Sequence, residues 1–461
     1  MGSVRTLFAA GIALLLAASL AAQPHPKLSA GPMPTYSEMT ETLIWVQTTR
    51  PADVVIRYRA AGQDREPMTA TPPVRTGPET HHIAQVRIPG LPMGTTFDYE
   101  LWIDGERVPR DYPLRFQTIP HWRWLTNPPQ PPNFSFALGS CAYINDTPFD
   151  RPGTPYGQGM EIFESIRAKS PDFMLWMGDN VYFREADWLT PDAMAYRWTQ
   201  NRALPELQPM LGGMHHYATW DDHDYGPNNS DRSFRLKGPA LELHKLFFPA
   251  VTWGTPDEAG VFQRFEWGDV EFFLTDNRYH RSPNSTPNDD PAKTMLGRAQ
   301  LQWLKDSLLN SDKTFKVIVN GGQMINPMIF FEAFGHFPAE QKDLFDFIAS
   351  SGVEGVLFLS GDRHATELLK VQWPGAPYPW YEFTSSPLTA GPGRNAAEAD
   401  NPARVPGTWV NVRNFGTVEV SGPWRNRVLT LRTFNTQGEE LWKHEIREQE
   451  LRRPRAPQEA A

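Results

Sequence analysis

Cysteine is almost absent from this sequence, since Cys141 is the only one among 461 residues. A single cysteine cannot form an intramolecular disulfide, which excludes a small disulfide-stabilised scaffold. An excess of positive charge is also missing, because 44 Lys and Arg stand against 53 Asp and Glu, giving a net charge of −9. No segment concentrates basic residues, so we expect no nucleic-acid partner. After residue 20, no apolar run is long enough to cross a membrane.

The first residues have the pattern of an export signal. Arg5 precedes an apolar run from residue 7 to residue 20, and the small residues Ala21 and Ala22 follow it. The pattern predicts a signal peptide over residues 1–22 and a periplasmic or secreted protein. A retained membrane anchor is the alternative, although the run is short for a span. Exported proteins meet an oxidising compartment, so the lone thiol of Cys141 requires protection by burial or by a metal ion.

The hydrophobic pattern changes along the chain and indicates two domains. Over residues 31–120, short alternating runs such as ETLIWVQT and FDYELWID are separated by Gly, Pro and Asp. This spacing predicts a small β-sandwich of the fibronectin or immunoglobulin kind. A Pro-rich stretch over residues 121–133 predicts a linker.

Residues 134–446 alternate apolar strands with amphipathic helices. FSFALGS, DFMLWMGD, FKVIVNGG and GVLFLSGDRH are typical of buried strands, and RAQLQWLKDSL and EQKDLFDFIASS are typical of helices. The alternation predicts an α/β core in which helices cover a central sheet. The β-type pattern after residue 409 is expected to complete a sheet, and the charged residues 447–461 are expected to fray.

Chemically reactive side chains follow five of the predicted strands. These strand ends read GSC (139–141), GDNVY (178–182), WDDHD (220–224), DNR (276–278) and GDRH (361–364). A single Asp or Ser after a strand is usually a cap or turn residue, but five such ends would be costly to bury without a ligand. Carboxylates suit hard cations, whereas thiolate and imidazole favour a softer transition metal. The set predicts two or more metal ions, which together can clamp a phosphoryl group.

The ordered motifs GSC, GDNVY, WDDHDYGPN, TDNRYHR, GRAQLQWL and GDRH resemble those of the alkaline phosphatase D (PhoD-like) family. The resemblance runs from about residue 134 to residue 388. It implies an α/β (α+β) fold of the calcineurin-like metallophosphoesterase type, in which a two-sheet sandwich is flanked by helices and preceded by a small β-sandwich. It also implies hydrolysis of phosphate monoesters and often diesters, with Fe³⁺ and Ca²⁺ as cofactors.

The resemblance also assigns roles to individual residues. It implies that iron is held by Cys141, Asp179 and Tyr182, with Asp179 bridging to calcium. The further metal ligands it implies are Asn228, Asp362 and His364. His223 is expected to stabilise or protonate the leaving group, Asp222 is a weaker candidate for the same work, and Arg278 is expected to bind the substrate phosphate.

Each of these residues also has a structural interpretation. Cys141 could be a small buried apolar residue, and Tyr182 a core aromatic whose hydroxyl is hydrogen bonded. His223 could bond a backbone carbonyl, and Arg278 could pair with Asp276 or Asp222. Asp221 and Asp224 are expected to cap or support rather than to bind metal. We interpret the remaining noted histidines, His215, His216, His280 and His336, as ordinary loop or strand residues.

The sequence departs from the family pattern at three points. The acidic residue that follows the tyrosine in many relatives is replaced by Phe183, Arg363 stands inside GDRH, and Arg5 does not form a twin-arginine signal. Substrate preference is expected to depend on the loops at residues 146–158 and 282–294. The sequence therefore predicts an exported metal-dependent phosphate-ester hydrolase that uses a metal-activated water. The alternatives are a phospholipid- or nucleotide-directed phosphodiesterase of the same fold and a catalytically degenerate binding protein.

Overall fold

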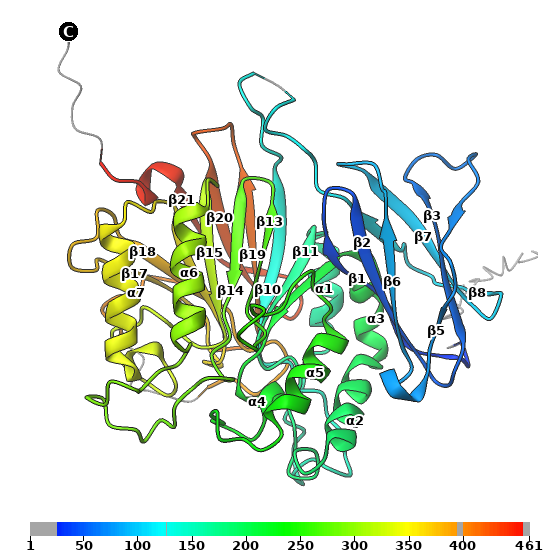
Figure 1. Ribbon diagram of the computed structural model, residues 1–461, viewed down its shortest axis with the longest axis horizontal. Coiled ribbons are helices and arrows are strands. Elements are labelled where there is room, and N and C mark those ends of the chain that lie inside the picture. The colour runs from blue at the N-terminus through cyan, green and yellow to red at the C-terminus, as the bar shows by residue number, and fades with distance from the viewer. Residues whose placement is uncertain (1–24, 126, 394–399, 455–461) are drawn as a thin grey trace, which may run out of the picture.

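The computed structural model describes residues 25–125, 127–393 and 400–454. It contains a β-rich domain, drawn in blue in Figure 1, packed beside a larger α/β domain. The predicted signal peptide lies outside the described residues. The described residues contain no helix that is long and apolar enough to span a membrane.

The first domain is a sandwich of two sheets. One sheet has the strand order β1-β2-β6, and the other has the order β4-β3-β7-β8, with β5 beside β3 and β9 beside β7. The strands are β1 (Leu28–Ser37), β2 (Glu41–Thr48), β3 (Asp53–Ala60), β4 (Thr69–Ala70), β5 (Val74–Arg75), β6 (Ile83–Pro89), β7 (Thr96–Ile103), β8 (Glu106–Val108) and β9 (Arg115–Gln117). Alternate residues of β6 and β7 are buried, and side chains such as Ile56, Val86 and Leu101 form the core between the sheets. The period-2 pattern of the sequence therefore produces the predicted β-sandwich.

The second domain contains two six-stranded mixed sheets that face each other. The first has the order β12-β11-β10-β19-β20-β21, and the second has the order β13-β14-β15-β16-β18-β17. The strands of the first are β10 (Phe134–Gly139), β11 (Phe173–Met177), β12 (His215–Thr219), β19 (Asn414–Ser421), β20 (Val428–Asn435) and β21 (Glu440–Arg447). Those of the second are β13 (Gln263–Trp267), β14 (Val270–Leu274), β15 (Phe315–Asn320), β16 (Val356–Ser360), β17 (Glu367–Val371) and β18 (Trp380–Thr384). Phe136 and Phe173 of the first sheet pack against Phe272 of the second, which joins the two sheets through one apolar core.

Helices cover the outer faces of both sheets (Figure 1). The first sheet is covered by α1 (Ile162–Ala168), α2 (Pro191–Arg202), α3 (Gln208–Gly213) and α5 (Lys237–Phe247). The second is covered by α6 (Arg298–Asn310) and α7 (Pro338–Ser350). A short helix, α4 (Asp222–Tyr225), follows β12, and 3-10 turns occur at Pro78–Thr80, Pro205–Leu207, Phe334–His336 and Glu448–Leu451. The predicted fold class, a two-sheet sandwich flanked by helices, is confirmed.

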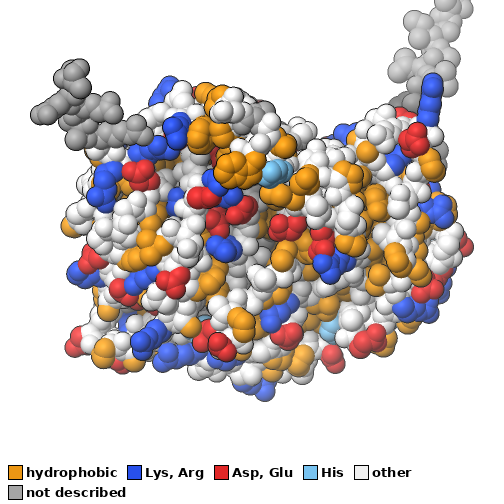
Figure 2. Space-filling view, turned by 45° about the horizontal axis from the view of Figure 1, so that its top comes forward, with side chains coloured by type: hydrophobic (Ala, Val, Ile, Leu, Met, Phe, Trp, Pro, Cys, Tyr) orange, Lys and Arg blue, Asp and Glu red, His pale blue; other side chains and the backbone are white. Residues whose placement is uncertain are grey.

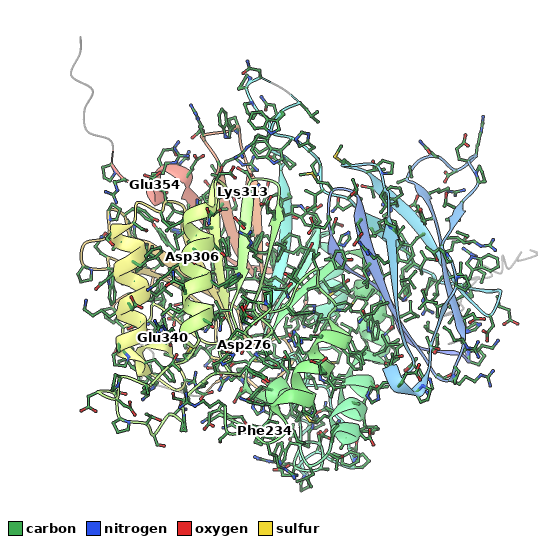
Figure 3. All side chains as sticks on the ribbon, in the orientation of Figure 1. Phe234, Asp276, Asp306, Lys313, Glu340 and Glu354 are labelled. Atoms are coloured by element: carbon green, nitrogen blue, oxygen red, sulfur yellow. The ribbon has the colours of Figure 1, made fainter. Side chains whose placement is uncertain are left out.

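Parallel pairing brings the functional strand ends to one edge of the molecule. β10, β11 and β12 are mutually parallel, as are β14, β15, β16 and β18. Figure 3 places Asp276, just after β14, at the lower edge of the sheets, whereas Lys313, before β15, lies at the opposite edge. Ligand sites of open α/β sheets lie beyond the carboxyl ends of the strands, which is this lower edge.

The C-terminal residues 447–454 are more ordered than the sequence predicts. Residues 448–451 form a 3-10 turn, Leu451 is completely buried, and its carbonyl accepts a 2.8 Å hydrogen bond from the Gly355 amide. The predicted fraying is therefore wrong for residues 447–454, because Leu451 packs into the core between the two sheets. Residues 455–461 lie outside the described part. The predicted linker, residues 121–133, falls between β9 and β10.

Acidic and basic side chains are interspersed over the face shown in Figure 2, which turns the top of Figure 1 toward the viewer. This face is the one away from the carboxyl edge of the strands.

Candidate metal centre

The strand ends at the carboxyl edge form three overlapping groups of metal-binding side chains. Within each group, one ligand atom per residue lies within 4.8 Å of the others. The groups are Cys141, Asp179 and His364; Asp179, Asp222 and His223; and Asp221, Asp222 and Asp362. Seven side chains from four strand ends therefore form one continuous cluster, in which Asp179 and Asp222 are shared.

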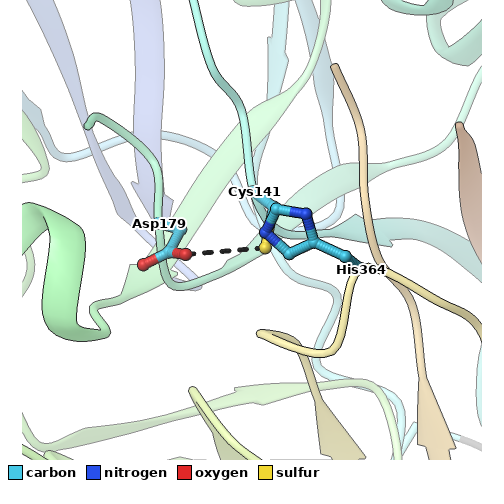
Figure 4. Close-up of side chains that lie close together, drawn as sticks. All are labelled: Cys141, Asp179 and His364. Atoms are coloured by element: carbon cyan, nitrogen blue, oxygen red, sulfur yellow. Dashed lines mark hydrogen bonds between the residues drawn. The ribbon is translucent and has the colours of Figure 1, made fainter. Parts of the chain in front are cut away.

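The first group combines a thiol, a carboxylate and an imidazole (Figure 4). Cys141 Sγ lies 3.5 Å from Asp179 Oδ2, and the Tyr182 hydroxyl lies 3.2 Å from His364 Nε2. His364 Nδ1 lies 2.5 Å from the Gly391 carbonyl, to which it donates in the neutral tautomer. This bond directs Nε2 toward Tyr182 and the cluster, which is how metal-binding histidines are usually oriented.

The two titratable residues of GDRH contribute to different groups. His364 joins the sulfur-containing group, whereas Asp362 joins the all-carboxylate group with Asp221 and Asp222. Residues two apart in an extended strand would face the same side, but Asp362 and His364 both have positive φ angles, and the turn between them separates their side chains. Arg363, between them, is buried, and its guanidinium lies over the rings of Phe330 and Phe331.

Four of the predicted ligands have an unusual backbone conformation. The φ angles of Cys141, Asp179, Asp362 and His364 are 61°, 52°, 68° and 52°. Residues other than glycine rarely adopt positive φ, and such strain concentrates at functional sites. The left-handed residue after each strand turns the chain sharply and aims the side chain into the cluster.

Asp224 fixes the loop that carries Asp179. Its Oδ1 accepts hydrogen bonds from the amides of Asp179 (3.2 Å) and Asp221 (2.7 Å), and its Oδ2 accepts from Asn180 N (3.0 Å) and Asn180 Nδ2 (2.6 Å). Both carboxylate oxygens of Asp224 thus accept two hydrogen bonds each, which leaves neither of them free to bind a metal ion. This agrees with the expectation that it supports the site.

Close backbone approach explains the glycine of GDRH. A Cβ on Gly361 would lie 2.5 Å from Ser140 Cβ and 2.6 Å from the Met177 carbonyl. Only glycine lets the ends of β10, β11 and β16 converge this tightly.

The electrostatics of the cluster favour a bound cation. Burial, and then the carboxylates of Asp222 and Asp221, raise the pKa of Asp179 well above its ordinary value. Burial and the same two neighbours raise the pKa of Asp362. Burial, and then Asp179, raise the pKa of the Cys141 thiol. Cations bound here would offset each of these costs, because they stabilise the charged forms.

Several buried polar atoms of the cluster have no hydrogen-bond partner among the described residues. Oδ2 of Asp221, Oδ1 of Asp222 and Nδ1 of His223 make no hydrogen bond to the described residues. Buried polar atoms are rarely left unpaired, so these three atoms have the chemistry expected of metal or substrate ligands. The donor set therefore fits metal ions: sulfur, phenol and imidazole on one side and carboxylates on the other.

The predicted catalytic residues lie at this cluster in different environments. The His223 ring lies against Tyr182, with ring centroids 4.2 Å apart. Its Nδ1 atom forms no hydrogen bond with the described residues, so it is not bonded to one of their backbone carbonyls. Arg278 is fully buried, with Nε 2.6 Å from Asp221 Oδ1 and Nη2 2.5 Å from Glu332 Oε2. Asn228 is exposed and lines a pocket with Tyr182, His223 and His364.

The sequence profile of the PhoD-like phosphatase family matches residues 136–423, which span most of the second domain. The chain belongs to the PhoD-like phosphatase family. A second profile, of a domain of unknown function (DUF7800), matches residues 25–121, the whole first domain.

Known PhoD-like proteins and related folds agree with this assignment. The chain is 23% identical over 305 residues to alkaline phosphatase D of Bacillus subtilis (strain 168), a match that covers 56% of this chain and about half, 49%, of that protein. A solved structure of PhoD aligns over 91% of this chain and 92% of its own, with a TM-score of 0.71 at 16% identity. The purple acid phosphatase PPD1 from yellow lupin (Lupinus luteus) aligns over 90% of this chain and 74% of its own, with a TM-score of 0.62 at 11% identity. At these identities the two structures establish the fold.

The sequence analysis did not predict the roles of two carboxylates of this PhoD-like site. Asp221 forms the expected capping box of α4 with Asp224, but it also belongs to the carboxylate group of the cluster. Glu332 forms ion pairs with both Arg278 and Arg281 and is buried. It lies in an irregular segment after β15 and belongs to no strand end, so its only signal was a charge within the apolar run MIFFEAF.

Proposed function

We propose that this protein hydrolyses phosphate esters, both monoesters and diesters, with bound metal ions as cofactors. The observation that carries the proposal is the continuous cluster of seven metal-binding side chains at the carboxyl edge of the sheets, which adjoins an open pocket. Membership of the PhoD-like phosphatase family and the alkaline phosphatase D relative support the same reaction class.

The ligand chemistry supports different ions in the two halves of the cluster. Cys141, Asp179 and Tyr182 would hold Fe³⁺, with His364 beside them, because thiolate and phenolate donors suit a transition metal. Asp362 and Asn228, together with the shared Asp179, would hold Ca²⁺, which prefers oxygen ligands. We add Asp221 and Asp222 to this second set because they share a group with Asp362. When bound, such ions polarise phosphoryl oxygens and lower the pKa of a water molecule.

The residues around the ions would position the substrate and move the proton. His223 would donate a proton to the leaving oxygen, since its Nδ1 has no partner among the described residues and its ring lines the pocket. Asp222 would hold His223 in place, as its carboxylate lies in the same group. Binding of the phosphate by Arg278 stays a prediction, because its guanidinium is already paired with Asp221 and Glu332.

We further propose that the protein acts outside the cytoplasm, on the evidence of the apolar run that follows Arg5. A catalytically degenerate binding protein is the second candidate. The seven metal-binding side chains at four strand ends argue against it.

Metal content and hydrolysis decide between these functions. The protein purified with its native metals should contain iron and calcium in stoichiometric amounts and should hydrolyse 4-nitrophenyl phosphate and bis(4-nitrophenyl) phosphate. Removal of the metals should abolish both activities, and their return should restore them. A metal-replete protein that cleaves neither ester would contradict the proposal, and a protein without stoichiometric metal would support the binding protein.

A further inference from the structure

A pocket of about 710 Å³ opens directly beside the metal centre. One end is lined by Tyr182, His223, Asn228 and His364, and the remainder by residues between positions 143 and 156 and between 183 and 188. A phosphoryl group held at the cluster would therefore extend its organic part into this pocket. Of the two loops expected to set substrate preference, residues 146–158 contribute to the pocket and residues 282–294 do not.

The apolar lining of this pocket consists of rings. It is formed by Tyr143, Phe149, Pro152, Tyr156, Tyr182, Phe183 and Trp188, and the described lining residues include no Leu, Ile, Val or Met. Tyr143 contacts Tyr156 edge to face, with centroids 4.9 Å apart, and Tyr182, with centroids 5.1 Å apart. Tyr182, Tyr143 and Tyr156 thus form a continuous aromatic surface beside the metal centre, where the Tyr156 hydroxyl lies 3.2 Å from His364 Nδ1. Phe149 and Tyr156 are 40% and 45% exposed, so their faces are available to a ligand.

Arg184 holds this aromatic surface in place. Its guanidinium lies 4.0 Å above the Tyr143 ring, and its Nη2 donates to the Ile144 carbonyl (2.6 Å) and to Asp150 Oδ1 (3.0 Å). The Tyr143 hydroxyl donates to the same carboxylate at 2.7 Å. The wall is therefore pre-organised before a ligand arrives, which lowers the entropic cost of binding.

The pocket also presents polar groups at its rim. Arg151 and Glu185 are exposed and line it, offering donors and an acceptor beside the rings. Aromatic walls with a few polar groups suit a flat heteroaromatic ring, which stacks on its faces and forms hydrogen bonds at its edge. An alkyl chain in this pocket would bury apolar surface, but it could not stack on the aromatic rings.

We propose that this pocket binds the organic group of the ester and that this group is a planar aromatic ring system, as in a nucleotide. This inference rests on the proposed phosphate-ester hydrolysis and specifies its substrate class.

Adenosine 5′-monophosphate and ribose 5-phosphate form a matched pair of substrates for the test. In both, the oxygen of a water molecule bonds to phosphorus, the bond from phosphorus to O5′ breaks, and O5′ leaves with a proton as a hydroxyl group. Only the base differs, so the ratio of the two kcat/KM values isolates recognition of the ring. We expect the ratio to exceed about fivefold in favour of the nucleotide, the effect of one stacked base.

Two substitutions remove an aromatic plane from the pocket and leave an apolar side chain in its place. Phe149→Leu and Trp188→Leu should each lower the ratio at least about threefold, while kcat/KM for ribose 5-phosphate stays within about twofold. Trp124→Leu is the matched control, because Trp124 is 79% exposed and does not line the pocket, and it should leave the ratio unchanged. If circular dichroism shows that Trp188→Leu is misfolded, Phe149→Leu remains as the test, because Phe149 is exposed.

The outcomes separate the inference from the proposed function. Cleavage of both substrates at equal kcat/KM, or a ratio unaffected by both substitutions, would overturn the inference and leave the hydrolase intact. Failure of the metal-replete protein to cleave either sugar phosphate or the nitrophenyl esters would instead overturn the hydrolase. Competition by free adenosine but not by phenol would assign the pocket to a nucleoside, and competition by both would assign it to aromatic rings in general.

Discussion

Cys141 is the residue whose substitution tests the metal centre most directly. Its thiol is completely buried beside Asp179, in surroundings that raise its pKa and disfavour the thiolate unless a cation is present. We predict that Cys141→Ala folds but loses most of its iron, measured by elemental analysis of the purified protein, because the only thiolate ligand is gone. Ser385→Ala is the control, since this buried hydroxyl donates to the Leu138 carbonyl and belongs to none of the metal-binding groups, and it should retain iron. Unchanged iron in Cys141→Ala would mean that the thiol is only a small core group.

His223 should matter most for esters with poor leaving groups. An alkoxide such as O5′ of ribose 5-phosphate needs a proton as it leaves, whereas 4-nitrophenolate leaves as a stable anion. We predict that His223→Ala lowers kcat about 100-fold for ribose 5-phosphate and much less for 4-nitrophenyl phosphate.

The metal content of the same variant distinguishes the two roles open to His223. It shares a group with Asp179 and Asp222, so a ligand role would show as lost metal and an equal loss of activity on both esters. Unchanged metal with a leaving-group-dependent loss is the outcome expected of a proton donor.

The loops at the strand ends depend on one carboxylate, Asp224. All four of its hydrogen bonds come from N–H donors, three of them on the loop of Asp179 and Asn180. Asp224→Asn would turn one acceptor into an amide that faces donors, so we predict a loss of about 1–3 kcal/mol in the free energy of unfolding, measured by urea denaturation. Metal affinity should fall as well, because the loop carries Asp179.

Asp192→Asn provides the comparison for this prediction. Asp192 is an exposed residue in the first turn of α2, so its substitution should change the free energy of unfolding by much less than 1 kcal/mol. Equal stability of the two variants would show that Asp224 is not needed to hold the loop.

The sequence could predict most of the strands that carry the site, because β10, β11, β14 and β16 are clear apolar runs that end in polar residues, whereas β12 (HHYAT) is not. Parallel pairing then brings Cys141, Asp179 and Asp222 to one edge of the first sheet, and the packing of the two sheets adds Asp362 from the second. The separation of Asp362 from His364 could not be predicted, since it follows from positive φ angles at both residues. The ion pair of Glu332 with Arg278 could not be predicted either. The position of Glu332 depends on how an irregular segment folds back onto Arg278, and no local sequence pattern indicates this.

The two domains are joined by buried polar contacts rather than by the linker alone. His215 of β12 accepts a 2.9 Å hydrogen bond from the Gln117 amide at Nε2, and its Nδ1 lies 3.0 Å from the Thr35 carbonyl. The Tyr217 hydroxyl accepts from the Ser37 amide at 2.9 Å, and Trp45 Nε1 donates to the Leu246 carbonyl at 3.0 Å. His215 is thus a structural histidine, as expected, and its neutral form fixes the first domain against the second.

Acid should destabilise the whole molecule through its buried histidines. Burial lowers the pKa of His215 to about 4 and those of His216 and His244 to about 3. In the unfolded chain these side chains titrate near pH ~6.5. Between that pH and about 4 the unfolded state binds more protons than the folded state, so the free energy of unfolding falls as the pH falls, by about 1.4 kcal/mol per pH unit for each histidine.

His244 allows this contribution to be measured separately. Its ring is fully buried among Trp198, Trp220 and Phe248. His244→Phe nearly preserves the shape of the ring and removes its titration. We predict similar free energies of unfolding for variant and parent at pH 8, and a slope between pH 6 and pH 4 that is shallower in the variant by about 1.4 kcal/mol per pH unit, measured by urea denaturation at each pH. Parallel slopes would show that His244 takes up no proton on unfolding and contributes nothing to the acid sensitivity of the fold.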